Sequence, residues 1–340
     1  MDGYADTVAE LPTPALVVER SVFERNLATM SAARPGVSLR PHVKAFKSTA
    51  IARRLDDAGH PAFCAATVAE IVGMAHAGLG HDLLLANETL DCRPLGEATE
   101  ATGARITVAV DSPQTIAAAV AGGVRHALID VEVGLPRCGC LVDEAGPLAD
   151  EARSKGLNVR GVMGYEGHLM MVGDPAERRS RVERAMGKLL EAHTAVGGDV
   201  ISAGGTGTYA VNEWANEIQA GSYLLMDTQY TTLEVPFEQA LSLVATVISV
   251  SPKGWFVANA GLKAMGMDHG DPTCPTAEVM FCSDEHTTLK PPEGGPLPAV
   301  GDQVRLLPAH VDPTVAKHPR MYVTDGDAVV DVWPVDLPHW

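Results

Sequence analysis

The chain has 340 residues, of which 46% are apolar, which is enough for one large domain and a smaller one. Its 43 acidic residues outnumber 26 Lys and Arg, and the resulting net charge of −17 disfavours nucleic acids and anionic membrane surfaces as partners. The first residues lack the pattern of a signal peptide, and no apolar run reaches the roughly 20 residues of a membrane span. We therefore expect a soluble, cytoplasmic protein that binds neither nucleic acid nor membrane.

Short β-prone runs alternate with longer alanine-rich stretches over the first two thirds of the chain, which is the pattern of βα units around a parallel sheet. The eight runs are Ser38–Ala45, Ala62–Thr67, Asp82–Asn87, Arg105–Asp111, His126–Val133, Val159–Gly167, Asp199–Gly205 and Glu217–Leu225. Helical spacing of apolar residues between them is clearest in 68–78, 114–122 and 176–195. Eight such units predict an α/β fold with a (β/α)8 TIM barrel.

The alternation of β-prone and helical segments ends near residue 236. The run from Leu241 to Val250, the turn Pro252-Lys253-Gly254 and the run that follows it indicate a β-hairpin, and further strand signals follow without a helix of ordinary length. We expect a barrel domain at 20–235 and a mainly β domain at 236–340, which the N-terminal segment 1–19 joins through a strand at Ala15–Glu19.

Functional residues of such barrels gather at the carboxyl ends of the strands. The seventh and eighth runs end in Gly204-Gly205-Thr206-Gly207 and Gly221-Ser222-Tyr223, where small residues let backbone amides approach a phosphate. Lys44 ends the first run, and we expect it across the barrel mouth from these turns, where desolvation would lower the pKa of its amine and favour Schiff-base chemistry. An ordinary lysine at a strand end is the alternative.

A second candidate site is the triplet His310-Val311-Asp312. On a strand, residues two apart face the same side, so this imidazole and carboxylate could bind one divalent ion. Taken alone, such a triplet is more often an ordinary pair of surface residues. Nearby His318 is expected to be exposed and not a ligand.

Motifs along nearly the whole chain resemble the D-threonine aldolase and D-serine dehydratase family, metal-dependent fold-type III pyridoxal-phosphate enzymes with an alanine-racemase-like barrel. These motifs are TPALVV at 13–18, RPHVK at 40–44, CAAT at 64–67, LLANE at 84–88, RCG at 137–139, GGTGT at 204–208, QAGSY at 219–223, AGLK at 260–263, DEH at 284–286 and HVDPT at 310–314.

This resemblance implies that Lys44 carries pyridoxal 5′-phosphate as an internal aldimine, and that His310 and Asp312 bind Mn²⁺, Zn²⁺ or Mg²⁺. It also implies a homodimer and a small D-amino acid substrate. The candidate cofactor-binding residues are Lys44, His42, Thr67, Arg137, Tyr165, Gly205, Thr206, Gly207, Gly221, Ser222 and Tyr223.

The sequence departs from the family pattern in three places. Phe46 replaces a frequent His, Ala316-Lys317 replaces a common Asn-Leu, and Met171 stands where the aldolases commonly have the histidine proposed as the base. The expected catalytic residues are therefore Lys44, Tyr165 and His168, with His168 or a metal-bound hydroxide as the base.

The implied reaction is cleavage of a D-β-hydroxy-α-amino acid, such as D-threonine, to glycine and an aldehyde. Asp312 favours cleavage, because the family's dehydratases tend to have Cys there. Three alternatives use similar parts: β-elimination from D-serine or D-3-hydroxyaspartate, amino-acid racemisation or epimerisation, and non-catalytic carriage of the cofactor.

Overall fold

The computed structural model describes residues 5–337, so 1–4 of the expected N-terminal segment and 338–340 of the expected β domain lie outside the described residues. The described chain forms two compact units. The barrel unit comprises 30–44, 49–221 and 337, and the β-rich unit comprises 5–29, 45–48 and 222–336. The domain boundaries expected from the sequence remain a prediction.

The barrel unit contains a parallel sheet of seven strands in the order β2-β3-β4-β5-β6-β7-β8. The strands are β2 Ala62–Ala65, β3 Asp82–Leu85, β4 Ile106–Val110, β5 His126–Asp130, β6 Asn158–Met163, β7 Val200–Ala203 and β8 Glu217–Ile218. Every residue of β2, β3 and β4 is buried, which explains why these strands are almost continuously apolar in sequence.

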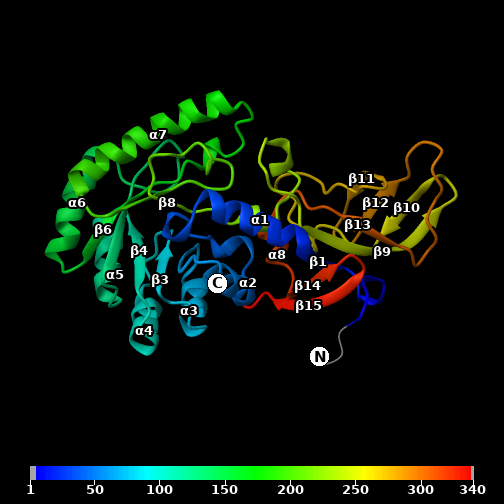
Figure 1. The fold of residues 1–340 in the computed structure, drawn as a ribbon, viewed down its shortest axis with the longest axis horizontal. Helices are drawn as coiled ribbons and strands as arrows, with labels where there is room; N and C mark the ends of the chain where they lie inside the picture. The colour runs from blue at the N-terminus through cyan, green and yellow to red at the C-terminus, as the bar shows by residue number, and fades with distance from the viewer. Residues whose placement is uncertain (1–4, 338–340) are drawn as a thin grey trace. The chain divides into compact units, whose positions relative to one another are not determined.

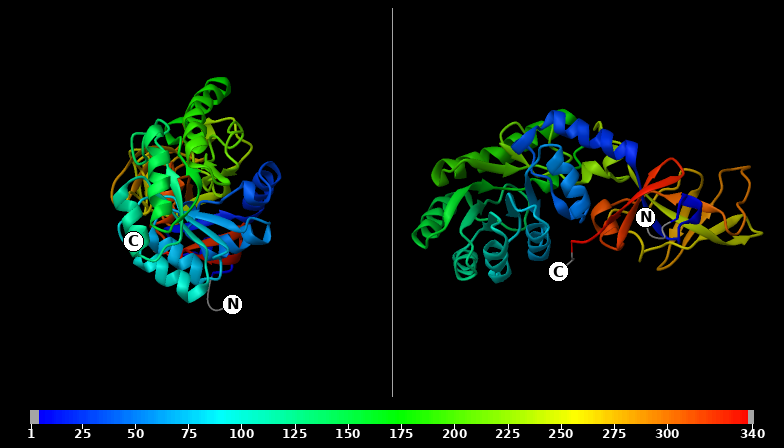
Figure 2. Two further views of the ribbon diagram at one scale, coloured as in Figure 1. Left: turned by 90° about the vertical axis from the view of Figure 1, so that its left-hand side faces the viewer. Right: turned by 60° about the horizontal axis from the view of Figure 1, so that its bottom comes forward.

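Helices connect these strands and lie along their outer face, where the cyan and green helices stand side by side (Figures 1 and 2). They are α2 Thr49–Asp57, α3 Val68–His76, α4 Arg93–Thr102, α5 Pro113–Ala121, α6 Val142–Ser154 and α7 Pro175–Val196. The helices expected at 68–78, 114–122 and 176–195 are confirmed. Ser112 illustrates their start signals, because its hydroxyl accepts a hydrogen bond from the Thr115 amide and caps α5.

The run expected as the first barrel strand, Ser38–Ala45, is not a regular strand but still closes the sheet. Parallel bridges join Leu39 to Ile218 of β8 and His42 to Cys64 of β2. The segment 39–42 therefore occupies the eighth position of the ring, and the predicted barrel class is confirmed.

Pro41 explains why this closing segment lacks a full ladder. The amides of Arg40 and His42 donate to carbonyls on the β8 side, and the Pro41 carbonyl accepts from Cys64 of β2. Proline has no N–H to donate to β2 in return, so one ladder bond is missing. The last expected run, Glu217–Leu225, is also shorter than predicted: only Glu217–Ile218 is a strand, and Ser222–Leu224 is a 3-10 turn.

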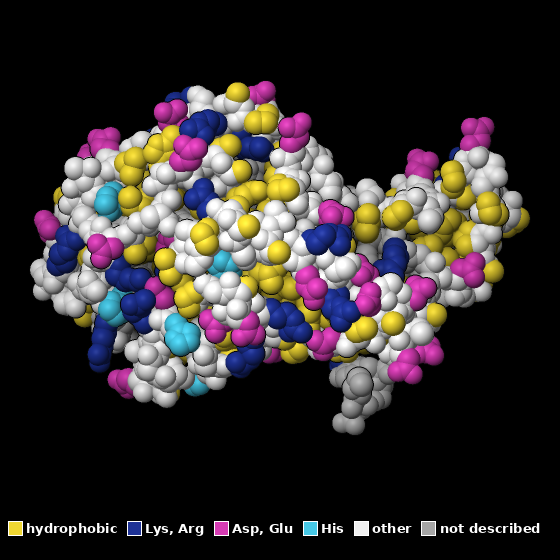
Figure 3. Space-filling view, in the orientation of Figure 1, with side chains coloured by type: hydrophobic (Ala, Val, Ile, Leu, Met, Phe, Trp, Pro, Cys, Tyr) yellow, Lys and Arg dark blue, Asp and Glu magenta, His cyan; other side chains and the backbone are white. Residues whose placement is uncertain are grey.

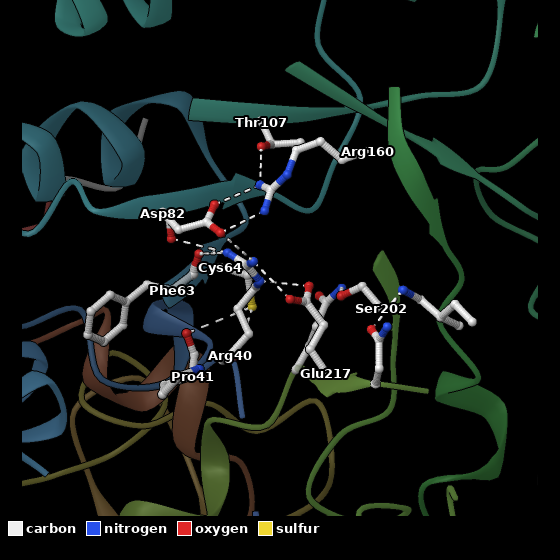
Figure 4. Close-up of polar contacts among 12 residues, drawn as sticks. Arg40, Pro41, Phe63, Cys64, Asp82, Thr107, Arg160, Ser202 and Glu217 are labelled. Carbon is white, nitrogen blue, oxygen red and sulfur yellow. Dashed lines mark hydrogen bonds and ion pairs between the residues drawn. The ribbon is translucent and has the colours of Figure 1, made fainter. Parts of the chain in front are cut away.

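A buried ion network joins the closing segment to strands around the ring (Figure 4). The Arg40 guanidinium lies 2.7 Å from Glu217 at the start of β8 and 3.1 Å from Asp82 at the start of β3. Asp82 also binds Arg160 of β6 at 2.7 Å, and Arg160 contacts Thr107 of β4. These strand beginnings mark the end of the barrel opposite the expected site, where residues contribute to stability rather than to catalysis.

The β-rich unit is built on a sheet in the order β11-β12-β10-β9-β1-β14-β15, and β13 pairs with β9. Its strands are β1 Ala15–Glu19, β9 Leu241–Ser251, β10 Trp255–Ala258, β11 Glu278–Cys282, β12 Thr287–Lys290, β13 Gln303–Leu306, β14 Arg320–Asp325 and β15 Ala328–Pro334. The predicted hairpin at Pro252-Lys253-Gly254 is confirmed as the β9–β10 connection. β1 pairs with β9 and β14, so residues from both ends of the chain share one sheet.

Acidic and basic side chains are interspersed over the face seen in Figure 3. Within residues 5–337, no helix combines the length and apolarity that a bilayer crossing requires. All six cysteines are free thiols.

Candidate active site

Lys44 lies at the end of the segment that closes the barrel. It is partly buried within the 3-10 turn Val43–Ala45, and its backbone amide lies 3.5 Å from Nδ1 of His42. The His42 amide in turn donates to the carbonyl of Ala220, just beyond β8. The sequence-based placement of Lys44 across the barrel mouth from the glycine turns is therefore wrong, because its segment is the direct neighbour of β8.

The glycine turn after β7 is pressed against the loop that follows β6. Gly204 has φ +82°, a conformation that favours glycine. A Cβ at Gly207 would lie 2.1 Å from the Met170 carbonyl oxygen, and one at Gly205 would lie 2.9 Å from Met170 Sδ. Both glycines are therefore required for packing against Met170, and their role in phosphate binding remains a prediction.

Tyr165 and Arg137 lie close to this turn. The Cβ position of Gly205 is 3.6 Å from the Tyr165 ring, and the Arg137 guanidinium carbon stands 5.4 Å from the centre of the same ring. The structure thus groups these three predicted cofactor residues. A cation, an aromatic ring and a glycine turn together suit the binding of an anionic, planar cofactor.

His168, the expected base, is exposed and belongs to the short 3-10 turn Gly167–Leu169. Its ring packs over Gly134, where an added Cβ would lie 2.9 Å from ring atoms Cε1 and Nε2. Gly134 has φ +130°, so a larger residue is disfavoured there on two grounds. The ring is therefore positioned by the loop between β5 and α6.

Thr67, another predicted cofactor residue, caps helix α3. Its hydroxyl accepts a hydrogen bond from the Glu70 amide, and the Glu70 carboxylate accepts one from the Thr67 amide. This is a complete capping box, so the start of helix α3 is sufficient to explain why a threonine stands at position 67.

A pair of carboxyl groups beside Arg137 was not predicted. Burial raises the pKa of Asp130 well above its usual range, and the charge and hydrogen bond of Glu88 raise it further. The Cys138 thiol also forms a hydrogen bond with Glu88, and burial together with that contact raises the pKa of the thiol to about 12. Glu88 and Asp130 both stand near strand ends in the sequence, and this position could have marked each as a candidate site residue. That the two carboxyl groups lie together could not be predicted, because it depends on how the fold places β3 and β5.

Contrary to the prediction from the sequence, His310 and Asp312 of the β-rich unit do not lie together on a strand. His310 is the N-cap of the short helix α8, Val311–Val315, and Asp312 lies in its first turn. The same-face argument for this pair is therefore wrong. The Val311 amide donates to the buried carboxylate of Asp227 at 3.0 Å, which anchors the start of the helix.

Asp268 and His269, which were not predicted as site residues, form a cluster with His310. Nδ1 of His310 lies 2.7 Å from Oδ2 of Asp268, and the rings of His269 and His310 stack with centres 3.8 Å apart at 13°. One possible ligand atom from each residue lies within 4.8 Å of the others. Two imidazoles and a carboxylate are a donor set suited to a divalent transition metal.

Two other predicted residues have different surroundings. The Ser222 hydroxyl donates to Oδ1 of Asp312 at 3.3 Å, so a candidate phosphate ligand contacts a candidate metal ligand. Tyr223 is fully buried, and its ring lies 5.5 Å from that of Phe237.

His318 is partly buried, although the sequence predicted an exposed residue. Its Nε2 lies 2.8 Å from the Ala264 carbonyl oxygen, and burial lowers the pKa of its imidazole.

Asp268→Asn is expected to weaken Mn²⁺ binding by roughly 10- to 100-fold, because the carboxylate either binds the ion or fixes the tautomer and orientation of His310. Binding is measured by electron paramagnetic resonance of free Mn²⁺ in titrations of the protein. Asp271→Asn, an exposed carboxylate three residues away, is the matched control. Equal affinities of the two variants would contradict this role for Asp268.

Two family models match the chain. The model described as alanine racemase, N-terminal domain, matches residues 18–229, and the model described as putative serine dehydratase domain matches residues 240–324.

Similarity to individual proteins extends over nearly the whole chain. A D-threonine aldolase from an Arthrobacter species is 32% identical, over 97% of this chain and 93% of its own length. A D-threo-3-hydroxyaspartate dehydratase from a Delftia species is 26% identical, over 96% and 98% of the two chains. The crystal structure of a D-threonine aldolase from Filomicrobium marinum superposes with a TM-score of 0.91 at 30% identity and covers 98% of both chains.

Proposed function

The chain belongs to the family of D-threonine aldolases and D-3-hydroxyaspartate aldolases and dehydratases, fold-type III pyridoxal-phosphate enzymes, and we propose that it cleaves D-β-hydroxy-α-amino acids to glycine and an aldehyde. It is thus a lyase that acts on small D-amino acids. The observation that carries the proposal is the presence, in one chain, of Lys44 on a segment that is hydrogen-bonded to Ala220, next to Gly221, and of a cluster of possible metal ligands around His310.

In this proposal, Lys44 holds pyridoxal phosphate covalently through Nζ. Arg137 and Tyr165 would line the site of the cofactor, and the turn Gly205-Thr206-Gly207 with Gly221 would receive its phosphate. When bound, the cofactor supplies an electron sink for the negative charge left at Cα by cleavage.

A divalent cation fits the cluster of Asp268, His269 and His310, with Asp312 as the further expected ligand. Such an ion supplies Lewis acidity toward the substrate's β-hydroxyl. The hydroxyl proton must leave as the Cα–Cβ bond breaks, and we assign its removal to Nδ1 or Nε2 of His168, because Met171 offers no base at the alternative position. We propose Mn²⁺ ahead of Zn²⁺ and Mg²⁺, because two imidazoles and carboxylate oxygens form a mixed set of nitrogen and oxygen ligands.

The second candidate is β-elimination, which the 26% identical dehydratase supports. In that reaction Lys44 would remove the α-proton and hydroxide would leave from Cβ. Asp312 in place of the cysteine typical of dehydratases favours cleavage. Racemisation or epimerisation, the homodimer and the cytoplasmic location also stay predictions.

Separate incubations with D-threonine and D-serine distinguish the two reactions. We expect glycine and acetaldehyde from D-threonine, loss of this turnover with a chelator, and recovery on addition of Mn²⁺. Formation of pyruvate and ammonia from D-serine, with no acetaldehyde from D-threonine, would overturn the assignment. Exchange of the α-proton with hydroxyl and carbon skeleton retained would instead indicate epimerisation.

A further inference from the structure

Glu166 is a fully buried carboxylate in the loop after β6, between Tyr165 and His168 in sequence. Its Oε2 accepts a hydrogen bond from the Gly204 amide at 3.0 Å. Its Oε1 accepts from Thr208 Oγ1 at 2.8 Å and from Asn212 Nδ2 at 3.0 Å. An ionised carboxylate inside a protein is costly unless such donors surround it, and all three donors here belong to one segment, 204–212.

Thr208 extends this arrangement into the turn. Its hydroxyl oxygen accepts from the Gly205 amide at 3.2 Å while its proton is directed to Glu166. The amides of both Gly204 and Gly205 are thereby fixed, directly or through Thr208. Because consecutive peptide planes are linked, fixing these two amides also restricts the directions of the amides that follow.

The other side of the turn is fixed by Asn212 and Met170. Oδ1 of Asn212 accepts from the amides of Trp214 and Ala215, so this side chain cannot rotate without losing several bonds. Met170 touches the turn at Gly205 and Gly207, as described above. The loop after β6 and the turn after β7 are thus one packed structure with a carboxylate at its centre.

We propose that Glu166 is a positioning residue, which pre-orders the turn 204–208 for the phosphate group and so makes the protein selective for phosphorylated pyridoxal over free pyridoxal. This inference rests on the proposed function, in which Lys44 binds that cofactor. Glu166 itself does not touch the phosphate: it is buried beneath the turn, and its negative charge would repel a phosphate in contact. Its effect is transmitted through Gly204 and Thr208.

The test uses apo-protein titrated separately with pyridoxal phosphate and with pyridoxal, followed by the visible absorbance of the protein-bound ligand. Glu166→Gln keeps the shape but points an amide donor where an acceptor is needed. We expect its affinity for pyridoxal phosphate to fall by roughly 10- to 100-fold, as for loss of hydrogen bonds to a charged group. Its affinity for pyridoxal is expected to change by less than about threefold.

Thr208 provides a second variant pair that leaves the carboxylate in place. Thr208→Val removes the hydroxyl at constant shape and is expected to show the same phosphate-specific loss, whereas Thr208→Ser retains the hydroxyl and wild-type selectivity. If Glu166→Gln does not fold, as judged by circular dichroism, this pair carries the test alone. Equal weakening of both ligands, or of neither, would overturn the inference while leaving the proposed function intact. A wild-type protein that takes up neither ligand would overturn both.

Discussion

Lys44→Ala is expected to fold normally and to lose turnover of D-threonine by on the order of 10⁴-fold, as when a covalent catalytic group is removed from other enzymes. The hydrogen bonds that close the barrel are made by the backbone of Arg40, Pro41 and His42, and the substitution leaves them in place. The cofactor, by contrast, loses its point of covalent attachment. Absorbance of the bound cofactor and acetaldehyde release measure the two consequences.

Lys155→Ala is the control for this experiment, because Lys155 is a solvent-exposed lysine at the end of α6 that pairs with Glu151. Normal turnover by Lys44→Ala would refute covalent attachment at this residue. A different pattern would indicate a cofactor carrier: loss of absorbance in Lys44→Ala, together with a wild-type protein that turns over no D-amino acid with any divalent metal.

The helices and most strands of the barrel could be predicted because their signals are local. Apolar periodicity defines α3, α5 and α7, and mainly apolar runs define β2 to β5. The closing segment could be located but its conformation could not, since the effect of Pro41 depends on which neighbour each amide faces. The conformation predicted for the triplet at His310 was also wrong, because the short helix α8 begins where the sequence suggested a strand.

The composition of the site was less predictable, because its contacts link residues far apart in sequence. Asp268 lies 42 residues before His310, and Glu166 lies 38 to 46 residues before its three donors. Periodicity carries no information about such pairs. Lys44 and the glycines were singled out because they stand at the ends of predicted strands and match family motifs, and their roles remain predictions.

Asp82→Asn is expected to destabilise the barrel unit by about 3–5 kcal/mol, the usual cost of breaking a buried ion pair. The substitution preserves the shape but leaves Arg40 and Arg160 with less compensating charge. The Asp82 carboxylate contacts both guanidinium groups and also Arg105 at 3.0 Å. Urea unfolding followed by circular dichroism measures the change.

Glu213→Gln is the matched control, because Glu213 makes an arginine pair of similar length, 2.8 Å to Arg179, at the exposed surface. Solvent screens that pair, so its removal is expected to leave the unfolding midpoint almost unchanged. A comparable loss of stability in the two variants would show that burial is not what makes the Asp82 network important.

The contribution of Asp82 is also expected to depend on pH. Burial alone would raise its pKa, but the hydrogen bonds and charges of Arg160 and Arg40 outweigh this and hold the pKa well below its usual range. A carboxyl whose pKa is lower in the folded than in the unfolded state stabilises the protein above its unfolded value, about 3.9. The stability difference between wild type and Asp82→Asn should therefore be constant near neutral pH and shrink as pH falls below about 4. A difference that instead grew in acid would mean that the Asp82 carboxyl is protonated in the folded protein, and the ionic account of this network would be wrong.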